Sequence, residues 1–483
     1  MDAPAATREA VVFDISLLAL HGGHAVGIIR VMRELARWAR ANRTDVAFVF
    51  FDRALGVFRR IMPEHLDDIV AGRALIDMSR LPDPGRSRRT LPERLPSALR
   101  GLGYWLRSPR RQAVVALERA RLAGRARRAW TEPFVRRLLS ARETVELVGP
   151  DGGRRMLLPF DLAAGEPYDF GPEDTLLYAG SDWSARTCEA VAALKALSGL
   201  RVAFVSYDVI PLKSPHFFVA DRAAAFKAMF DAVIAMTDVV MVTARSVAAD
   251  IAGYCEAHGM VAPQARLFLP GSDLVDAGVA PTVLPFGLQA GRYALFVSTI
   301  EPRKGHRLLF DAWKRLETEG VPRRSDFRLV FVGRRGWMVD ALMADIEAHP
   351  SFGSSLLVLS SVDDHELHAL YQGAAFTLFP SRDEGYGLPV VESFRHGKAV
   401  LASSAGALPE VIGDFSPQLD PRDEDAWLAA LRRWIEDPAA RAPYEAALAR
   451  HYRHPGWAEA AATFFAVLAS DAEPAAARFE GTG

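Results

Sequence analysis

The stretch FTLFPSRDEGYGLPVVESFRHGKAVLAS, residues 376–403, contains two apolar runs separated by a glycine-containing loop and a helical pattern. FTLFP reads as a buried strand and AVLAS, at 399–403, as the next one. A helix is predicted to begin near Leu388, because Pro389 suits a first helical turn. Strand, helix and strand in this order predict a parallel βαβ unit.

The same alternation extends toward the N-terminus. Before the quoted stretch we predict strands YALFV, FRLVFV and LLVL, and helices at 306–319, 338–348 and 364–373, with the helix of the quoted stretch at 388–397. Farther upstream, AVVFDISLL (10–18), VAFVFF (46–51), VAFVSYD (202–208) and VVMVTA (239–244) are predicted strands. Such alternation is typical of an α/β fold in which helices cover both faces of a parallel sheet.

A chain of 483 residues exceeds what one hydrophobic core usually supports, so we expect two domains. The Pro- and Gly-rich stretch 269–291 is the predicted boundary. The predicted parts are an N-terminal Rossmann-like domain (1–275) with an Arg-rich helical insertion at about 75–145, a C-terminal Rossmann-like domain (276–450), a helix packing back on the first domain (451–470) and a disordered tail (471–483).

Composition indicates a cytoplasmic protein. Cys188 and Cys255 are too few for a disulfide framework, and we find neither a signal peptide nor a membrane-spanning run. Between Arg86 and Arg142 there are 16 Arg against three acids. This insertion either is a solvated basic helix or contacts the inner face of an anionic membrane peripherally. In the second case each basic residue could add ~1 kcal/mol to the free energy of membrane binding. Nucleic acid is disfavoured, because no binding module accompanies the basic run.

Two carboxylates flank the predicted helix start in the quoted stretch. Glu384 lies in the loop and Glu392 about one turn into the helix, beside unpaired N–H groups that favour an anion. Ionised carboxylates accept several hydrogen bonds and therefore suit recognition of hydroxyl groups. The alternative is a helix-dipole effect that contributes only about 0.3–1 kcal/mol to stability.

A second loop carries the basic counterpart. In VSTIEPRKGH, residues 297–306, Arg303 and Lys304 follow a predicted strand and precede a helix. At the carboxyl edge of a parallel sheet they could hold a diphosphate through hydrogen bonds of about 1.5–3 kcal/mol each. A surface pair with Glu301 is the competing interpretation.

Together these stretches resemble the retaining GT-B glycosyltransferases of family four, the clan of mannosyltransferases and glycogen synthase. EGYGLPVVE has that family's two glutamates separated by seven residues, and EPRKGH resembles its diphosphate-binding loop. Further matches are VFDIS with GIIR at 27–30, GSDW at 180–183, SYDVIPLKSP at 206–215, FVGRRGW at 331–337 and LPEVIGD at 408–414. The resemblance implies two Rossmann-like domains whose parallel sheets face each other across a cleft, with the acceptor on the first and the nucleotide-sugar donor on the second.

The resemblance also implies roles for individual residues. Arg303 and Lys304 would hold the donor diphosphate, Glu384 would contact the transferred sugar and Glu392 the ribose. The remaining implied donor contacts are Gly385, Tyr386, Gly387 and Leu388 through their backbone N–H groups, Gly27 near the phosphates, and Gly333, Arg334 and Val362 near the base. Tyr207 and Asp208 would lie on the acceptor side.

The implied reaction moves a hexose or deoxyhexose from a nucleotide diphosphate sugar to a surface glycan, lipid-linked in one form of the hypothesis, with retention of configuration. No metal or other cofactor is expected, because cations and a helix end supply the positive field. His365 and His368, three apart, lack a third ligand. We expect Glu384→Ala to abolish turnover with little loss of thermal stability.

Two residues depart from the family pattern. Tyr207 stands where many members have His, and Ser298 where a subset has a phosphate-binding Arg. The alternatives are therefore a sugar-nucleotide epimerase with the same fold, or a non-catalytic nucleotide-sugar binding or scaffold module. The retained glutamates and Lys304 favour the transferase.

Overall fold

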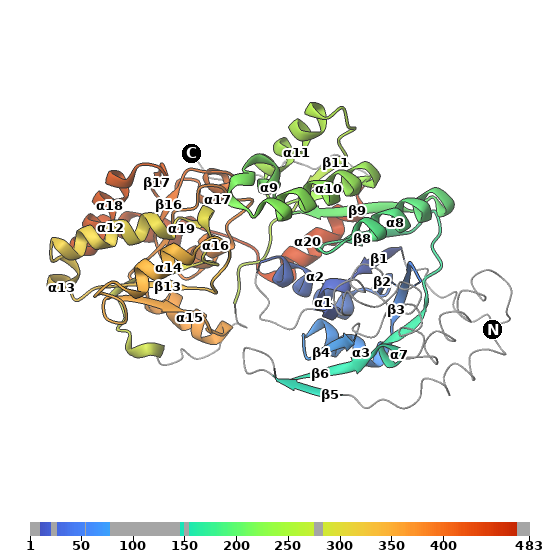
Figure 1. Cartoon of the computed structure of the whole chain (residues 1–483), viewed down its shortest axis with the longest axis horizontal. Coiled ribbons are helices and arrows are strands. Elements are labelled where there is room, and N and C mark those ends of the chain that lie inside the picture. Colours follow the sequence, from blue (N-terminus) through green and yellow to red (C-terminus); the bar gives the residue numbers. More distant parts are fainter. Residues whose placement is uncertain are drawn as a thin grey trace, which may run out of the picture. The chain divides into compact units, whose positions relative to one another are not determined.

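The computed structural model describes residues 10–20, 27–53, 55–77, 145–148, 154–274 and 284–470, which form two compact units (Figure 1). The first unit ends at Val202 and the second begins at Ala203. Residues 78–144 of the predicted Arg-rich insertion and the tail 471–483 lie outside the described residues. The membrane contact, the boundary at 269–291 and the domain limits drawn from it stay predictions.

The first unit contains a mixed sheet. Its strands follow the order β8 (Thr175–Tyr178), β1 (Val11–Asp14), β2 (Val46–Asp52), β3 (Val57–Ile61) and β7 (Ala164–Pro167). β1 is parallel to β2 and β8, whereas β3 is antiparallel to both of its neighbours. Helix α2 (Ile28–Asn42) connects β1 to β2 and buries its apolar stripe, which includes Met32 and Leu35. The parallel pairing expected of the predicted strands in 10–18 and 46–51 is confirmed for β1 and β2.

The predicted strand at 10–18 is wrong after Asp14. The carboxylate of Asp14 accepts a hydrogen bond from the backbone N–H of Ser16 at 2.9 Å, which turns the chain. Helix α1 (Ser16–Leu20) follows at once. The apolar residues Leu17 to Leu20 therefore belong to a helix and not to a strand of the sheet.

The other described elements of this unit cover or flank the sheet. They are α3 (Pro63–Val70), α7 (Phe160–Ala163), α8 (Ala185–Ser198), and a separate sheet in the order β4 (Ala74–Asp77), β6 (Arg154–Pro159), β5 (Val145–Val148). Ser184 caps α8 by accepting from the N–H of Thr187 at 3.2 Å.

The second unit contains a six-stranded sheet in which every pairing is parallel. The order is β14 (Leu356–Leu359), β13 (Arg328–Val332), β12 (Tyr293–Val297), β15 (Phe376–Phe379), β16 (Val400–Ser403), β17 (Gln418–Leu419). Numbered along the chain this is 3-2-1-4-5-6, the doubly wound order, in which the strand order reverses between β12 and β15 while the strands stay parallel. Ligands of such sheets bind outside the carboxyl ends of the strands at this switch point.

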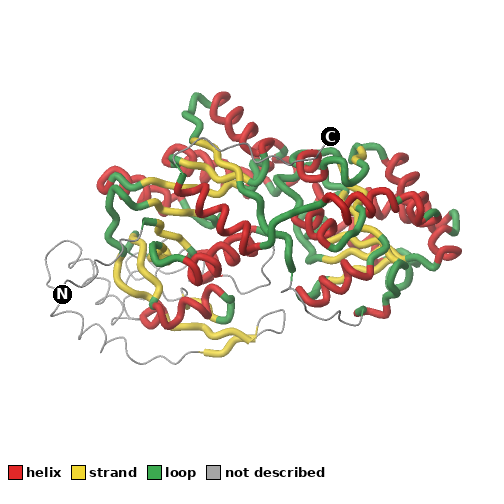
Figure 2. Tube along the Cα trace, turned by 180° about the vertical axis from the view of Figure 1, so that it is seen from behind, coloured by secondary structure: helices red, strands yellow, loops and turns green. Residues whose placement is uncertain are grey.

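Helices cover both faces of this sheet (Figure 2). They include α12 (His306–Thr318), α13 (Val321–Ser325), α14 (Asp340–Glu347), α15 (Asp364–Gly373), α16 (Leu388–Arg395), α17 (Leu408–Ile412), α18 (Glu424–Glu436) and α19 (Ala442–His451). In β12, Ala294 and Phe296 belong to the larger core on one face, and Tyr293 and Leu295 to the core on the other. Burial on both faces explains why this strand is a continuous apolar run, and the predicted strand and helix order is confirmed.

Three further strands precede the six-stranded sheet in the sequence and pair in parallel with one another. They are β9 (Arg201–Ser206), β10 (Val239–Val242) and β11 (Gln264–Leu267). Helices α9 (Ile210–Lys213), α10 (Ala220–Met236) and α11 (Arg245–Ala257) connect them. The C-terminal helix α20 (Trp457–Ala469) packs against β11, where Arg266 donates to the carbonyl of Val467 at 2.9 Å.

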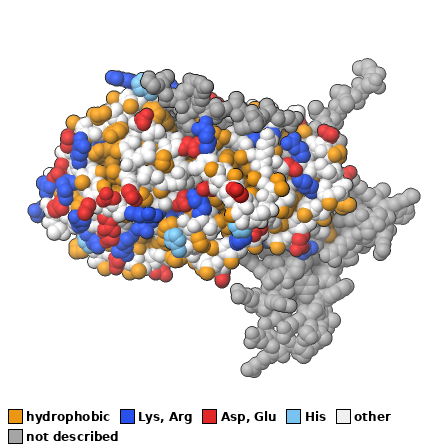
Figure 3. Space-filling view, turned by 90° about the horizontal axis from the view of Figure 1, so that it is seen from above, with side chains coloured by type: hydrophobic (Ala, Val, Ile, Leu, Met, Phe, Trp, Pro, Cys, Tyr) orange, Lys and Arg blue, Asp and Glu red, His pale blue; other side chains and the backbone are white. Residues whose placement is uncertain are grey.

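Ion pairs lie on the outer surface of α12, α13 and α18. They are Arg315–Asp425, Arg324–Glu436 and Arg432–Glu319, and basic and acidic side chains are intermixed on the surface in Figure 3. These pairs are exposed, so each contributes little to stability.

Candidate functional site

The site begins where two loops meet at the switch point. Residues 298–305 follow β12 and residues 380–387 follow β15. The N–H of Arg382 donates to the carbonyl of Arg303 at 2.7 Å. Gly305, at φ 85°, lies so close to the other loop that an added Cβ would be 2.5 Å from the carbonyl oxygen of Pro380. The contact between the loops therefore requires glycine at this position.

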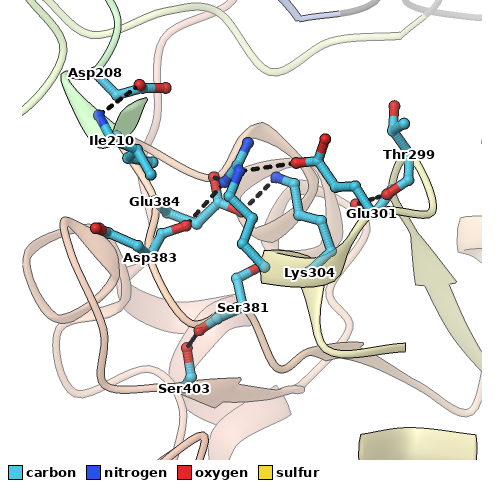
Figure 4. Close-up of polar contacts among 12 residues, drawn as sticks. Asp208, Ile210, Thr299, Glu301, Lys304, Ser381, Asp383, Glu384 and Ser403 are labelled. Atoms are coloured by element: carbon cyan, nitrogen blue, oxygen red, sulfur yellow. Dashed lines mark hydrogen bonds and ion pairs between the residues drawn. The ribbon is translucent and has the colours of Figure 1, made fainter. Parts of the chain in front are cut away.

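Glu384 is held by the two predicted cations, of which Figure 4 labels Lys304. Its Oε1 accepts from the ammonium of Lys304, and its Oε2 is 3.1 Å from Nη1 of Arg303. All three side chains are largely buried, with Glu384 7 % exposed. The surface-pair interpretation of Arg303 and Lys304 is therefore wrong, since exposed pairs would not share a buried carboxylate.

Charge and burial compete at these groups. Burial alone would raise the pKa of Glu384, but Arg303 and Lys304 outweigh it and lower that pKa to about 2. Burial, and then the charge of Arg303, lower the pKa of Lys304. The site thus holds an ionised carboxylate and two cations away from bulk water.

A further carboxylate, Glu301, lies beside Arg303 and is 3 % exposed. Its Oε1 is 2.8 Å from Nε of Arg303, yet neither atom has a hydrogen-bond partner, so this contact is an ion pair without hydrogen-bond geometry. Arg303 instead directs Nη1 to the carbonyl of Asp383 at 2.8 Å. Burial raises the pKa of Glu301.

The depressed pKa of Glu384 predicts a pH dependence of stability. A carboxyl whose pKa falls on folding, here from 4.5 to about 2, stabilises above the unfolded value and loses that contribution as the pH falls toward 2. The contribution is about 3 kcal/mol at neutral pH. Urea unfolding at pH 2–7 should show a steeper acid loss for the wild type than for Glu384→Gln. Parallel curves would contradict the assignment.

The N-terminus of α16 carries unpartnered backbone donors. Gly387, at φ 102°, precedes the helix, and within the described ranges no hydrogen bond uses the N–H groups of Gly385, Tyr386, Gly387 or Leu388. These are the four groups that the sequence singled out. N–H groups at a helix start attract anions through their own polarity and through the helix dipole.

Gly385 lies against the segment after β9. An added Cβ would be 1.9 Å from the carbonyl oxygen of Tyr207 and 2.7 Å from Cβ of Asp208. Asp208 accepts from the N–H of Ile210 at 3.0 Å, and burial raises its pKa. The structure thus brings Tyr207 and Asp208 to the loop of Glu384, while their place on the acceptor side stays a prediction.

Glu392 lies on α16 and is 6 % exposed. Its Oε2 accepts from the hydroxyl of Tyr371 at 2.9 Å. Behind them, His396 shares a hydrogen bond with His368 at 2.9 Å and stacks on Tyr371. Glu392 is therefore fixed in direction, while its contact with a ribose stays a prediction.

The remaining predicted residues occupy different surroundings. Gly333, at φ 154°, lies close to the loop after β12. A Cβ added at Gly333 would be 1.9 Å from the carbonyl oxygen of Ser298, so only glycine fits there. Arg334 is exposed and Val362 packs partly on the smaller core. Gly27, at φ 54°, belongs to the first unit. Base and phosphate contacts of these four residues stay predictions.

Tyr386 differs from its neighbours, because its side chain serves packing. It is 7 % exposed and its hydroxyl shares a hydrogen bond with Nε2 of His454 at 2.7 Å. Only its backbone N–H remains a candidate ligand contact.

Sequence reasoning missed Thr243 and Glu410. Thr243 donates to the carbonyl of Gly385 at 3.1 Å, and the carboxylate of Glu410 accepts from the N–H of Arg245 at 2.9 Å, at the start of α11. Glu410 lies in the quoted motif LPEVIGD, which was a usable signal. Thr243 had none, because its partner is 142 residues away.

No group of three or more His, Cys, Asp or Glu among the described residues could hold a metal ion, although His396 does join His368. In the same residues, every helix is too short or too polar to cross a membrane. The expectation that no metal is needed stays a prediction.

Comparison with known proteins gives a match for the part of the chain, about a third of it, that carries this loop pair. Residues 288–450 match the family model described as glycosyl transferases group 1. The chain carries a group 1 glycosyl transferase domain. Of the site residues predicted from the sequence, this domain contains all except Gly27, Tyr207 and Asp208.

Two curated proteins to which this chain is similar are mannosyltransferases of Escherichia coli. The serotype-specific mannosyltransferase WbdA is 29 % identical over 284 residues, 56 % of this chain and 33 % of that protein. O-antigen chain mannosyltransferase B is 36 % identical over 161 residues, 33 % of this chain and 41 % of that protein. The chain thus spans less than half the length of these relatives.

Among solved structures, the sucrose-phosphate synthase of Thermosynechococcus elongatus is similar with a TM-score of 0.44 and 18 % identity. The similarity covers 61 % of this chain and 72 % of that one.

Proposed function

We propose that the chain is a retaining glycosyltransferase that moves a hexose from a nucleotide diphosphate sugar to a surface-glycan acceptor. The observation that carries the proposal is that two contacting loops hold buried Arg303 and Lys304 on one side and four unpartnered N–H groups at the start of α16 on the other. This arrangement supplies positive charge and hydrogen-bond donors at the position where doubly wound sheets bind ligands. Mannose is the proposed hexose, since both relatives are named mannosyltransferases.

Each group has a part in the proposed reaction. Arg303, Lys304 and the N–H groups bind the diphosphate, and they stabilise the charge that grows on it as the glycosidic C–O bond breaks. Glu384 holds both cations in place and accepts hydrogen bonds from sugar hydroxyls. Glu392, fixed by Tyr371, accepts from the ribose hydroxyls.

The proposed stereochemical course is front-face substitution, following the family resemblance of EGYGLPVVE. The acceptor hydroxyl attacks the anomeric carbon from the side that the diphosphate leaves. A departing phosphate oxygen takes the hydroxyl proton, so no separate strong base is required. The product keeps the anomeric configuration of the donor.

A screen of nucleotide sugars tests the proposal. Purified protein is incubated with UDP-, GDP-, dTDP- and ADP-sugars, with EDTA present, and both the melting temperature and release of nucleoside diphosphate are measured. We expect one nucleotide to raise the melting temperature and its sugar to be slowly hydrolysed without metal. Response to none of the four would contradict a live donor site.

A further inference from the structure

Two successive carbonyl groups of the loop before α16 are held from outside the loop. The carbonyl of Glu384 accepts from the N–H of Ala407 at 2.8 Å. The carbonyl of Gly385 accepts from the hydroxyl of Thr243 at 3.1 Å. Thr243 directly follows β10 and is 2 % exposed, so this hydrogen bond is shielded from water.

These bonds fix the direction of the donors on the same peptides. Both peptides are trans, and in a planar trans peptide the N–H points opposite to the C=O. Ala407 therefore sets the direction of the Gly385 N–H, and Thr243 sets that of the Tyr386 N–H. Both N–H groups belong to the unpartnered set at the helix start.

Thr243 holds the second of these peptides directly, through its carbonyl group. The backbone of Tyr207 lies directly against Gly385, which limits translation of the loop. Rotation of the Gly385–Tyr386 peptide would require the Gly385 carbonyl to leave Thr243 and lose a buried hydrogen bond. The buried, β-branched side chain of Thr243 has little freedom to follow.

We propose that Thr243 is a positioning residue for the donor: its hydroxyl orients the Gly385–Tyr386 peptide so that the Tyr386 N–H donates to an anionic oxygen of the diphosphate. This inference rests on the proposed function, because it names how the same site is pre-organised. Thr243 does not touch the ligand. It acts through the peptide that it holds.

Two substitutions at this position separate orientation from packing. Thr243→Val keeps the shape and removes the hydroxyl, whereas Thr243→Ser keeps the hydroxyl and removes a methyl group. Each should lower the melting temperature by a few degrees, because one leaves a buried carbonyl unpaired and the other leaves a small void. Only Thr243→Val should weaken binding of the nucleoside diphosphate that stabilises the wild type, by about tenfold, the equivalent of 1.4 kcal/mol.

The decisive measurements are calorimetric titration of both variants with UDP, GDP, dTDP and ADP, and their crystal structures. A rotated Gly385–Tyr386 peptide in Thr243→Val and a native one in Thr243→Ser support the inference. An unrotated peptide in Thr243→Val, wild-type affinity of that variant, or equally weak binding by both variants overturns it. If the wild type binds none of the four nucleotides, the proposed function and the donor role of Thr243 both fail. A rotated peptide in Thr243→Val would then show only that Thr243 orients the Gly385–Tyr386 peptide.

Discussion

Replacing Glu384 with glutamine is expected to lower kcat by about 10²–10³-fold, the loss typical of removing one preorganised electrostatic group from an active site. Glutamine keeps the size of the side chain but removes the negative charge that Arg303 and Lys304 share. The two buried cations would then repel each other and shift away from the positions that suit a diphosphate. Initial rates of transfer at saturating donor measure the effect.

The pairing of Glu384 with Arg303 and Lys304 also changes the expected effect of Glu384→Ala on thermal stability. The sequence suggested that Glu384→Ala would leave thermal stability nearly unchanged, but the structure shows two buried cations that depend on this carboxylate. Removing one partner of a buried pair costs about 3–5 kcal/mol, so the melting temperature should fall as well. A lowered melting temperature therefore no longer identifies a purely structural role.

A control variant separates the two effects. Ser416→Ala removes a buried hydroxyl that bonds to Val400 at the start of β16, the end of the strand opposite to the site. It should lose about 1–3 kcal/mol of stability and keep the wild-type kcat. If Glu384→Gln turns over donor as fast as Ser416→Ala, Glu384 has no part in the reaction.

The sequence was sufficient to predict the strands of the second unit because most of them are apolar runs between loops. YALFV, for example, is buried on both faces, and its limits match β12. The loops of Lys304 and Glu384 could be expected to meet only because the doubly wound order places β12 beside β15. In that strand order, the loops of Lys304 and Glu384 are neighbours although these residues are 80 positions apart in the sequence.

What the sequence could not supply was side-chain direction. The bond from Thr243 to Gly385 depends on tertiary packing that no local pattern encodes. At Asp14 a side-chain to backbone hydrogen bond ends a strand in the middle of an apolar run, against the hydrophobic pattern. The pairing of Glu384 with both cations, rather than of Arg303 with Glu301 alone, likewise follows from burial that charge spacing does not report.

Gly385→Ala is expected to lower kcat/KM by at least about 100-fold, because misplacing a site by roughly 1 Å can have an effect of this size. The added methyl group would be 1.9 Å from the carbonyl oxygen of Tyr207. A backbone atom cannot rotate out of the way as a side chain can, so the loop itself has to move. That displacement carries the Gly385 and Tyr386 N–H groups and the Glu384 carboxylate with it. Steady-state kinetics against donor measure the loss.

Gly253 provides the matched control for this substitution. It is exposed within α11, and an added Cβ would meet no atom within 4 Å. Gly253→Ala should keep wild-type kcat/KM and gain about 0.5–1 kcal/mol of stability, since alanine is favoured over glycine inside a helix. Gly385→Ala should instead lose about 1–3 kcal/mol through overpacking, together with its activity. Equal activity of the two alanine variants would mean that the approach of Tyr207 to Gly385 does not set the geometry of the donor site, and the assignment of the N–H groups at α16 would fall with it.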